Sequence, residues 1–400
     1  MQQPTKAIYE SAPNAAADYE RRLREVTATA AKHADAVDSA ARFPAEAFEL
    51  IKAQRLLGLM VPVELGGEGA GFRAVTNICY QLGQVCGSTA MIYAMHQVKV
   101  ACLVRHGLKS PAIVGLLRRL AAEQLLLASS TTEGTAGGNI RASEAPVVCS
   151  GDRFTLERRA TCISYGAAAD GIVTTARRTA DAPASDQVLV AVLKNDYTLT
   201  HIQGWDTFGM RGTCSDGYLL KVAAHRDYIL PMPYERIHVQ TMVPSAHLFW
   251  GSVWAGIAAT ATVRAQAFVR HAARHGNGQL PPGAAHYTRA FSMLGALRGR
   301  LESALADFER DRDDEQALGA LEFQSMIALT KVEVSDLAAA IVLETLRACG
   351  LSGYRNDTEF SIGRLLRDVL SSPIMIHNDR VMSNLSTPTL MAAIPRRLCA

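Results

Sequence analysis

The chain has 400 residues, of which 48% are hydrophobic and 20% are charged, and its formal net charge is only +3. This composition excludes a disordered chain, and the length predicts two or three domains with substantial cores. Basic residues are scattered among acidic ones instead of gathering in runs, so we expect no nucleic-acid partner. The eight cysteines form no C-x-x-C pair, and we interpret them as buried thiols of a reducing compartment that hold no metal ion. The first residues carry no apolar core behind their charges, so we expect no secretory signal and a cytoplasmic protein.

The first block of the chain, about residues 15–122, has apolar residues at helical spacing. Pro44 followed by Glu46 is typical of the first turn of a helix. A glycine-rich connection, VPVELGGEGAGF, precedes a second helical pattern over residues 75–106. We therefore predict an N-terminal α-helical domain, residues 1–123.

From about residue 125 the pattern changes to short runs of β-branched and apolar residues between turn signals. The predicted strands are LLLASS, PVVCS and RFTLE around a Ser150–Gly151–Asp152 turn, GIVTTARR, VLVAVL and GYLLKVAAHRDYIL. No crossover helices separate these strands, so we expect antiparallel pairing in a barrel or sandwich over residues 124–235. The cluster EGTAGGN lies between two strands instead of opening a helix, so it is not a dinucleotide-binding fingerprint.

After Pro231 the helical spacing returns and holds almost to the end, which predicts a third domain, residues 236–400. Residues 248–269 are nearly uncharged over about the length of a membrane-spanning helix. Because small residues there favour close packing, and Arg264 and Arg270 interrupt or bound the segment, we predict a buried helix of a bundle and no membrane contact. The fold class is therefore α+β, in the order helices, sheet, helices.

Five motifs in this order resemble those of the acyl-CoA dehydrogenase superfamily across nearly the whole chain. They are VPVELGGEGAG, ASSTTEGTAGGN, LERRATCISYGAAADGIVTTAR, GWDTFGMRGTCSDGYLL and RACGLSGYRNDTEFSIGRLLRDV. The resemblance implies a C-terminal four-helix bundle and FAD held between the middle sheet and the C-terminal helices. It also implies a homotetramer or homodimer, in which the ADP half of FAD reaches a neighbouring subunit, and a substrate that is an acyl-CoA or an acyl-carrier thioester.

The resemblance places several residues along the flavin: Ser129, Thr131, Thr132, Cys162, Ile163 and Ser164. Ser164 matches a threonine whose hydroxyl points towards flavin N5, where a donor stabilises the electron-rich reduced ring. Cys162 stands where the family usually has a tryptophan that shields one flavin face, so its small side chain leaves space beside the ring. Taken singly, these hydroxyl residues would be interpreted as a solvated strand face.

The remaining residues implied by the resemblance lie further along the chain. Those expected to bind the cofactor are Cys349, Gly350, Gly353, Asn378 and either Arg270 or Arg274, between which the sequence does not choose. Those expected to line the substrate are Gly137, Gly138, His96 and Arg211. We interpret Arg367 and Asp368 as an ion pair that fixes a helix end. Glycine at the expected pyrophosphate turn would permit close backbone approach.

The carboxylate that removes the α-proton during dehydrogenation is missing from both positions where the family carries it. Counting from Arg367-Asp368, the commoner position holds Ile376, followed by His377. The other position falls in SAHLFWG, which has no acidic residue. The Ile376 backbone N–H could still bond a thioester carbonyl.

Three functions remain open on the sequence. The missing glutamate and tryptophan favour an oxygenase that uses flavin and O2, because relatives with this fold include flavin oxygenases. The alternative is dehydrogenation, with electrons passed to an acceptor and a relocated base: His377, Asp379, Glu344 or His96. The third is a redox-silent flavin-binding protein that only packs in a complex.

Overall fold

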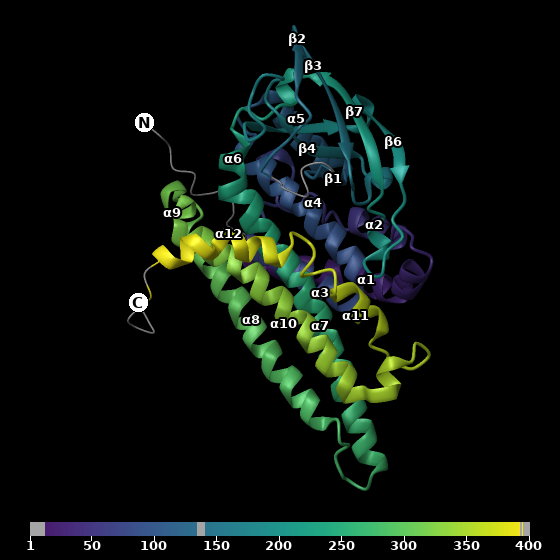
Figure 1. Ribbon diagram of the computed structural model, residues 1–400. Helices are drawn as coiled ribbons and strands as arrows, with labels where there is room; N and C mark the ends of the chain where they lie inside the picture. Colours follow the sequence, from purple (N-terminus) through teal and green to yellow (C-terminus); the bar gives the residue numbers. More distant parts are fainter. Residues whose placement is uncertain (1–12, 134–140, 393, 395–400) are drawn as a thin grey trace.

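The computed structural model describes residues 13–133, 141–392 and 394. Helices come first, strands follow, and long helices complete the chain, which confirms the predicted α+β class and element order. Figure 1 shows the strands gathered at one end of the molecule and the long C-terminal helices extending away from them. The N-terminal helices lie between these two parts.

The N-terminal helices match the predicted helical block. They are α1 (Pro13–Ser39), α2 (Ala45–Ala53), α3 (Phe72–Val85), α4 (Gly87–His106) and α5 (Pro111–Glu123), with a 3-10 turn η1 (Val63–Leu65). Pro44 stands immediately before α2, as expected. Most residues of α4 are buried, so this helix runs through the interior and not along the surface.

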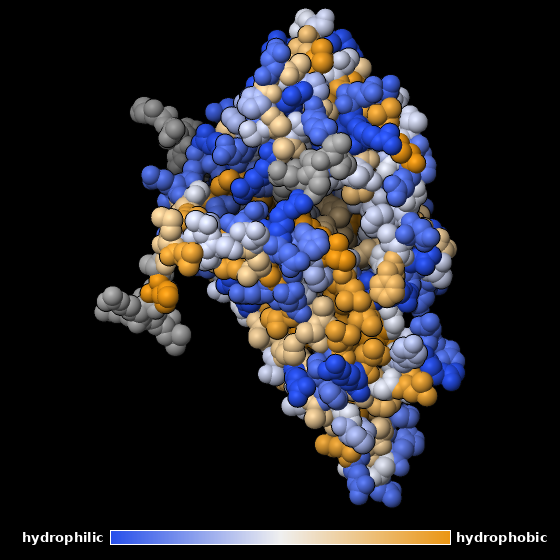
Figure 2. All heavy atoms as spheres, in the orientation of Figure 1, coloured by the Kyte–Doolittle hydropathy of each residue, from blue (hydrophilic) through white to orange (hydrophobic). Residues whose placement is uncertain are grey.

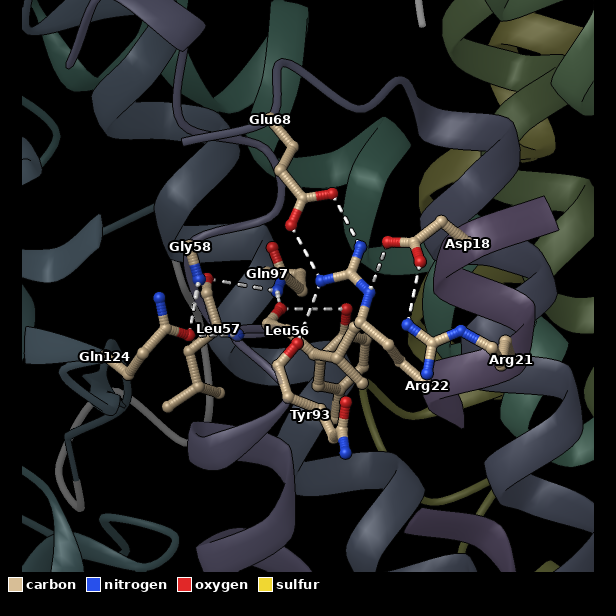
Figure 3. Close-up of polar contacts among 11 residues, drawn as sticks. Asp18, Arg21, Arg22, Leu56, Leu57, Gly58, Glu68, Tyr93, Gln97 and Gln124 are labelled. Atoms are coloured by element: carbon tan, nitrogen blue, oxygen red, sulfur yellow. Dashed lines mark hydrogen bonds and ion pairs between the residues drawn. The ribbon is translucent and has the colours of Figure 1, made fainter. Parts of the chain in front are cut away.

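A buried, irregular segment joins α2 to η1, and side chains from α4 and from Gln124, the residue after α5, satisfy its backbone (Figure 3). The Gln124 Oε1 atom accepts hydrogen bonds from the N–H groups of Leu57 (3.0 Å) and Gly58 (3.3 Å). On α4, the Tyr93 hydroxyl and the Gln97 amide both donate to the Leu56 carbonyl. Because a buried backbone group without a partner is costly, these bonds fix α4, whose opposite face borders the cavity described below.

The strands form two sheets. The three-stranded sheet has the order β1 (Leu127–Ser130), β4 (Gly171–Arg177), β5 (Gln187–Leu193). The four-stranded sheet has the order β2 (Val148–Ser150), β3 (Arg153–Ala160), β7 (Gly217–His225), β6 (Tyr197–Gln203).

Two details of the predicted sheet were wrong. β1 and β4 pair in parallel, with Leu127 opposite Gly171, although all pairing was expected to be antiparallel. The chain between β1 and β4 passes through β2 and β3 in the other sheet, and its described residues return to β1 without an α-helix. β6 was not predicted, because its half-polar sequence YTLTHIQ lacks the apolar run of the other strands.

Arg158 joins the two sheets. It lies on β3 with a fully buried side chain, and its guanidinium donates to the Thr175 carbonyl on β4 and to the Ser143 hydroxyl. Its charge is paired with Glu133, whose Oε1 atom lies 3.3 Å from Arg158 Nη1. A buried charge needs such a partner, so this pair holds the end of β1 against the four-stranded sheet.

The C-terminal block contains the long helices of the bundle. They are α7 (Val243–His275), α8 (Ala284–Asp311) and α10 (Leu321–Tyr354), accompanied by the shorter α6 (Tyr234–Ile237), α9 (Glu315–Gly319), α11 (Gly363–Val369) and α12 (Asn378–Met391). α7 contains the apolar segment predicted to be a buried bundle helix. Among the described residues, no helix is long and apolar enough to cross a membrane.

Helix α7 packs against α3 with almost no space between the backbones. A Cβ atom on Gly256 would lie 2.2 Å from the Tyr80 carbonyl oxygen, and one on Gly83 would lie 2.5 Å from the Val253 carbonyl oxygen. Only glycine fits at either position. This close approach fixes the C-terminal bundle against the N-terminal helices.

We expect Gln124→Met to lower the free energy of unfolding by about 1–3 kcal/mol, because it leaves the buried Leu57 and Gly58 N–H groups without an acceptor. Chemical denaturation monitored by circular dichroism measures the change. Gln279→Met, at an exposed position, is the control and should change stability by less than about 0.5 kcal/mol. Equal stability of the two variants would contradict the role assigned to Gln124.

Candidate active site

A cavity of about 560 Å³ lies where the three blocks of the chain meet. This volume is within the usual range of small-molecule sites. Figure 2 shows a hollow on this face between the strands and the C-terminal helices, with hydrophobic side chains along its rim. The walls are mainly apolar, and their larger members are Met91, Met95, Trp205, Phe208, Met242 and Trp250.

The β-strand side of the cavity carries hydroxyl groups. Ser129 on β1, and Thr131 and Thr132 just after it, line this wall. Cys162 and Ser164 follow β3 and line the same cavity, and the Cys162 sulfur lies 3.8 Å from the Thr132 hydroxyl. The structure thus brings together these five residues, which the sequence placed along a flavin from two separate motifs. Ile163 lies between two of them, but its side chain is buried in the core.

A chain of three hydroxyl groups ends at the cavity. The Ser215 hydroxyl donates to Ser164 Oγ at 2.8 Å, and Thr213 Oγ1 lies 2.8 Å from Ser215 Oγ. The Thr213 hydroxyl donates its own proton to the Met210 carbonyl oxygen at 2.8 Å. Each hydroxyl has one proton. Because Ser215 donates its proton to Ser164, the Ser164 proton is left to point into the cavity.

Unusual backbone conformations gather around the same cavity. Met210 and Ile376 line it with φ angles of +52° and +51°, and Tyr165 and Cys214, beside lining residues, have +46° and +44°. Such conformations cost about 1–3 kcal/mol each and cluster at functional sites. At Tyr165, the turn sends Ser164 into the cavity while the Tyr165 ring is buried and its hydroxyl donates to the Leu127 carbonyl.

Ile376, the vacant base position, lines the cavity on the C-terminal side. Its carbonyl accepts a 2.7 Å hydrogen bond from Lys331, a buried lysine of α10. The same ammonium donates to the Asn378 side chain at 2.6 Å. Positive φ is strained for a β-branched residue, so Lys331 holds Ile376 in place. Among the described residues, the Ile376 N–H has no hydrogen-bond acceptor.

None of the described residues that line the cavity is an aspartate or a glutamate. One histidine does line it: His247 of α7, which is only 4% exposed. Its Nδ1 atom lies 3.0 Å from the Ile327 carbonyl oxygen, which can only accept, so we assign the proton to Nδ1 and leave Nε2 as an acceptor. Burial lowers the pKa of His247 to about 4. The imidazole is therefore neutral near pH 7.

His247 was not predicted as a site residue, because the segment SAHLFWG was considered only as a possible source of a carboxylate. The signal was present: a histidine in a helical segment that is otherwise apolar. Thr213 and Ser215 were quoted within a motif, but no pattern indicated that their hydroxyls would meet Ser164, which lies on another loop.

Other predicted site residues lie outside this cavity lining. His377 has a side chain that is 59% exposed, beside Asp379. Asn378 is buried among Lys331, Ser335 and Asp336. Their relation to a bound ligand stays a prediction.

The two predicted substrate residues that the structure describes also lie elsewhere. His96 uses both ring nitrogens in the protein, at 2.9 Å from the Leu57 carbonyl and 3.0 Å from the Leu127 N–H. Arg211 begins the 3-10 turn η4 (Arg211–Thr213), outside the lining residues. Gly137 and Gly138 fall outside the described residues.

The residues predicted to hold the ADP half of the cofactor are also remote from the cavity lining. Arg270 and Arg274 lie on the last turns of α7, and Cys349 is buried. Gly350 has φ +55° within α10, and Gly353 packs against Cys349. Their expected role involves a second subunit, so it stays a prediction.

Arg367 and Asp368 do not pair with each other. Arg367 pairs with Asp38 of α1, and Asp368 accepts a 2.7 Å hydrogen bond from the Met210 N–H. Between them, a Cβ on Gly209 would lie 2.0 Å from the Arg367 carbonyl oxygen. α11 is thereby tied to both α1 and the β6–β7 loop, which closes one side of the cavity.

Comparison with known proteins agrees with this architecture. Residues 17–110 match the acyl-CoA dehydrogenase N-terminal domain. The chain is 25% identical over 363 residues to the cyclohex-1-ene-1-carbonyl-CoA dehydrogenase of Geobacter metallireducens, covering 86% of this chain and 89% of that protein. It is also 25% identical over 358 residues to the amino sugar nitrososynthase DnmZ of Streptomyces peucetius, covering 84% of each.

A solved structure shows the same fold over almost the full length. The FMN-bound TdsC of Paenibacillus sp. A11-2 is similar with a TM-score of 0.81 and 17% identity, covering 94% of this chain and 98% of that one. The fold, with a cavity between its strands and its C-terminal helices, thus belongs to the acyl-CoA dehydrogenase class. Over most of its length the chain is similar to proteins of the acyl-CoA dehydrogenase superfamily, from which its sequence has diverged.

We expect acid to destabilise the protein partly through His247. The pKa of the folded-state imidazole, about 4, lies below the unfolded value of about 6.5, so the unfolded state binds more protons between these values. The stabilising contribution is complete above pH 6.5 and is lost as the pH falls towards 4. Between pH 7 and pH 5 the loss from this residue is about 2 kcal/mol.

The variant His247→Gln keeps a donor for the Ile327 carbonyl and removes the titration. Between pH 7 and pH 5, the free energy of unfolding should therefore fall by about 2 kcal/mol less in this variant than in the wild type. His201→Gln, with a side chain that is 57% exposed in the parent, is the control. A pH dependence identical to that of the wild type would show that His247 is not a buried, neutral imidazole.

Proposed function

We propose that this protein is an FAD-dependent oxidoreductase that oxygenates an acyl-CoA or acyl-carrier thioester with O2, in the cytoplasm. The observation that carries the proposal is the cavity itself: a hydroxyl-bearing wall that suits a flavin, combined with a lining in which no described residue is a carboxylate. The first feature supports the cofactor, and the second favours oxygenation over dehydrogenation.

The residues around the cavity fit a flavin ring. An isoalloxazine is flat, apolar on its faces and polar along its edge. The apolar walls include Trp205, Met210 and Trp250, while Ser129, Thr131 and Ser164 supply polar groups on the β-strand side. When bound, the flavin supplies two-electron chemistry, by accepting a hydride or by activating O2.

The motif that contains Cys349, Gly350 and Gly353 favours FAD over FMN. We propose that this motif approaches the pyrophosphate of FAD bound to a neighbouring subunit, and FMN has no pyrophosphate. The FMN bound to the similar TdsC makes FMN the alternative. Because this motif lies away from the cavity, we expect a homodimer or homotetramer, and we expect isolated subunits to lose FAD.

The chain's own residues then hold and orient the reactants. Ser164, at the end of the hydroxyl chain, donates to the flavin edge, where a fixed donor stabilises developing negative charge. The Ile376 N–H, which has no acceptor in the described part of the chain, donates in this proposal to a thioester carbonyl. Burial of both groups in an apolar cavity excludes water, which strengthens these hydrogen bonds.

The absence of a carboxylate from the described lining argues against ordinary dehydrogenation, which needs a base for the α-proton. Oxygenation does not need that base: O2, two electrons and two protons convert the substrate to its oxygenated product and water. The small Cys162 side chain leaves space beside the flavin position, as a reaction with O2 requires. The relatives include both a dehydrogenase and a nitrososynthase.

His247 favours one second candidate, α,β-dehydrogenation with an imidazole base. It lines the cavity, it is neutral, and its Nε2 atom is the acceptor. This position lies in the segment that replaces the family's alternative glutamate. His377 is the weaker candidate for this role because its side chain is exposed.

Mixing the purified, flavin-loaded protein with acyl-CoA esters, with and without oxygen, tests the proposal. Product that forms only with O2 and a reductant supports oxygenation. Rapid bleaching of the flavin by a saturated acyl-CoA under strict anaerobiosis, abolished in His247→Gln, would establish dehydrogenation instead. A stable protein that purifies without flavin and does not take it up would leave the redox-silent alternative.

Ile376→Glu should create or increase anaerobic reduction of the flavin by a saturated acyl-CoA such as butyryl-CoA. The reason is that the new carboxylate takes the position of the missing base. The acid will be partly buried in an apolar cavity, so it will carry a raised pKa and lower the stability. Ile376→Gln has the same shape without the acid and is the control. Equal flavin reduction by both variants would show that the substrate Cα does not approach this residue.

Ser164→Ala should weaken flavin binding about tenfold, since one hydrogen bond of about 1–1.5 kcal/mol is lost. Ser215→Ala should have a smaller effect in the same direction, because it removes the donor that orients the Ser164 hydroxyl. Fluorescence titration of the flavin-free protein measures both constants. Ser150→Ala, at the exposed end of β2, is the control. Wild-type affinity in Ser164→Ala would remove this hydroxyl from the flavin site.

A further inference from the structure

Lys99 is a buried cation on the cavity wall, and no anionic group among the described residues pairs with it. It lies on α4, is only 3% exposed and lines the cavity. Its ammonium donates to the Met242 sulfur at 3.2 Å, the one hydrogen bond it makes among the described residues. A thioether is a weak acceptor, and an ammonium has three N–H groups to satisfy.

Burying an ammonium without a counter-ion is expensive, and folding alone gives no reason for a lysine at this point. The other buried lysine of this region, Lys331, shows the usual solution: two oxygen acceptors, the Ile376 carbonyl and the Asn378 side chain. Lys99 has only the sulfur. The difference between the two lysines is that Lys99 borders the cavity, so a ligand can supply the missing acceptor.

The surroundings of Lys99 leave its charge uncompensated. Burial lowers the pKa of Lys99 to about 8, so most of it remains ammonium at pH 7. The ionisable groups around it are Cys102 on the same helix and His238, His247 and Tyr234 on the facing segment. Burial lowers the pKa values of His238 and His247 and raises those of Cys102 and Tyr234, so all four are neutral near pH 7.

The helix that faces Lys99 is distorted at this point. His238–Met242 form a π-helix between α6 and α7, and Met242, its last residue, supplies the sulfur. Pro244 follows, and proline clashes with the carbonyl four residues before it, so the wider turn has a local cause. π-helical turns are frequent at functional sites. Here the turn places Met242 on the cavity wall beside the lysine.

We propose that Lys99 binds an anionic oxygen of the substrate, such as a carboxylate or an ionised phenol or enol, within the cavity. A thioester carbonyl carries no charge, so the anion belongs to another part of the molecule. The preferred substrates are therefore acyl or aryl compounds with an additional acidic group. This inference rests on the proposed function only in taking the cavity as the reaction site.

Calorimetry on the flavin-loaded protein with matched probes tests the proposal. The probes are benzoate, phenylacetate and cyclohexanecarboxylate, each beside its neutral amide of the same shape. The wild type should bind at least one acid at least tenfold more tightly than its amide. Lys99→Met should lose this preference and still bind the amide with wild-type affinity. Lys109→Met, at an exposed position near the end of the same helix, should behave as the wild type.

Thermal denaturation gives a second readout. Lys99→Met should melt at a higher temperature than the wild type, because it removes an unpaired buried charge and keeps the side-chain volume. A lower melting temperature would show that Lys99 has a structural role and would overturn the proposal. So would equal binding of acids and amides, binding of neither, or an acid preference that survives in Lys99→Met.

The two proposals fail in different ways. Protein that binds flavin and reacts with O2, but shows no preference for acids, overturns the role of Lys99 alone. Protein that takes up no flavin, but prefers acids in a manner that depends on Lys99, overturns the oxidoreductase alone.

Discussion

The close crossing of α3 and α7 is the constraint on which the cavity depends. Two glycines, Gly83 and Gly256, let the helix backbones meet where any side chain would collide with a carbonyl oxygen. α7 therefore lies in the interior, against the N-terminal helices. His247 and Trp250 on α7, with Met242 just before it, form one wall of the cavity because of this placement. The strands supply the opposing hydroxyl groups, and the segment from Arg367 to Ile376 closes the remaining side.

Within these walls, charge is distributed in a way that separates this protein from a dehydrogenase with a carboxylate base. The described lining offers a neutral imidazole, the Lys99 ammonium, a row of hydroxyls and Arg367, whose guanidinium is paired with Asp38. Lys331 is buried but satisfied, and its hydrogen bond fixes the strained backbone of Ile376. Lys99 is buried and almost unsatisfied. The first lysine thus shapes the site, whereas the second leaves a place for a ligand's negative charge.

Most of the architecture followed from local patterns. Helical spacing indicated α4 and α7, and the Ser150–Gly151–Asp152 turn between β2 and β3 has the expected left-handed glycine. The errors concerned long-range pairing. β1 lies parallel to β4, and no local pattern records which strand becomes a neighbour after an excursion through another sheet. β6 was missing from the predicted strands. It is an edge strand with a solvated face, so its sequence is half polar and lacks an apolar run.

The sequence by itself determined the class of the fold, the hydroxyl residues of the β-strand wall and the loss of the carboxylate at Ile376. Each of these depends on residue types at fixed intervals along the chain. Only the tertiary structure decided that His247 and Lys99 face the cavity, that His96 and His377 do not line it, and that Ser215 meets Ser164. The reason is that burial and hydrogen bonding depend on which segments pack together. In α4 and α7, which are buried on most sides, helical spacing does not tell the cavity face from the core face.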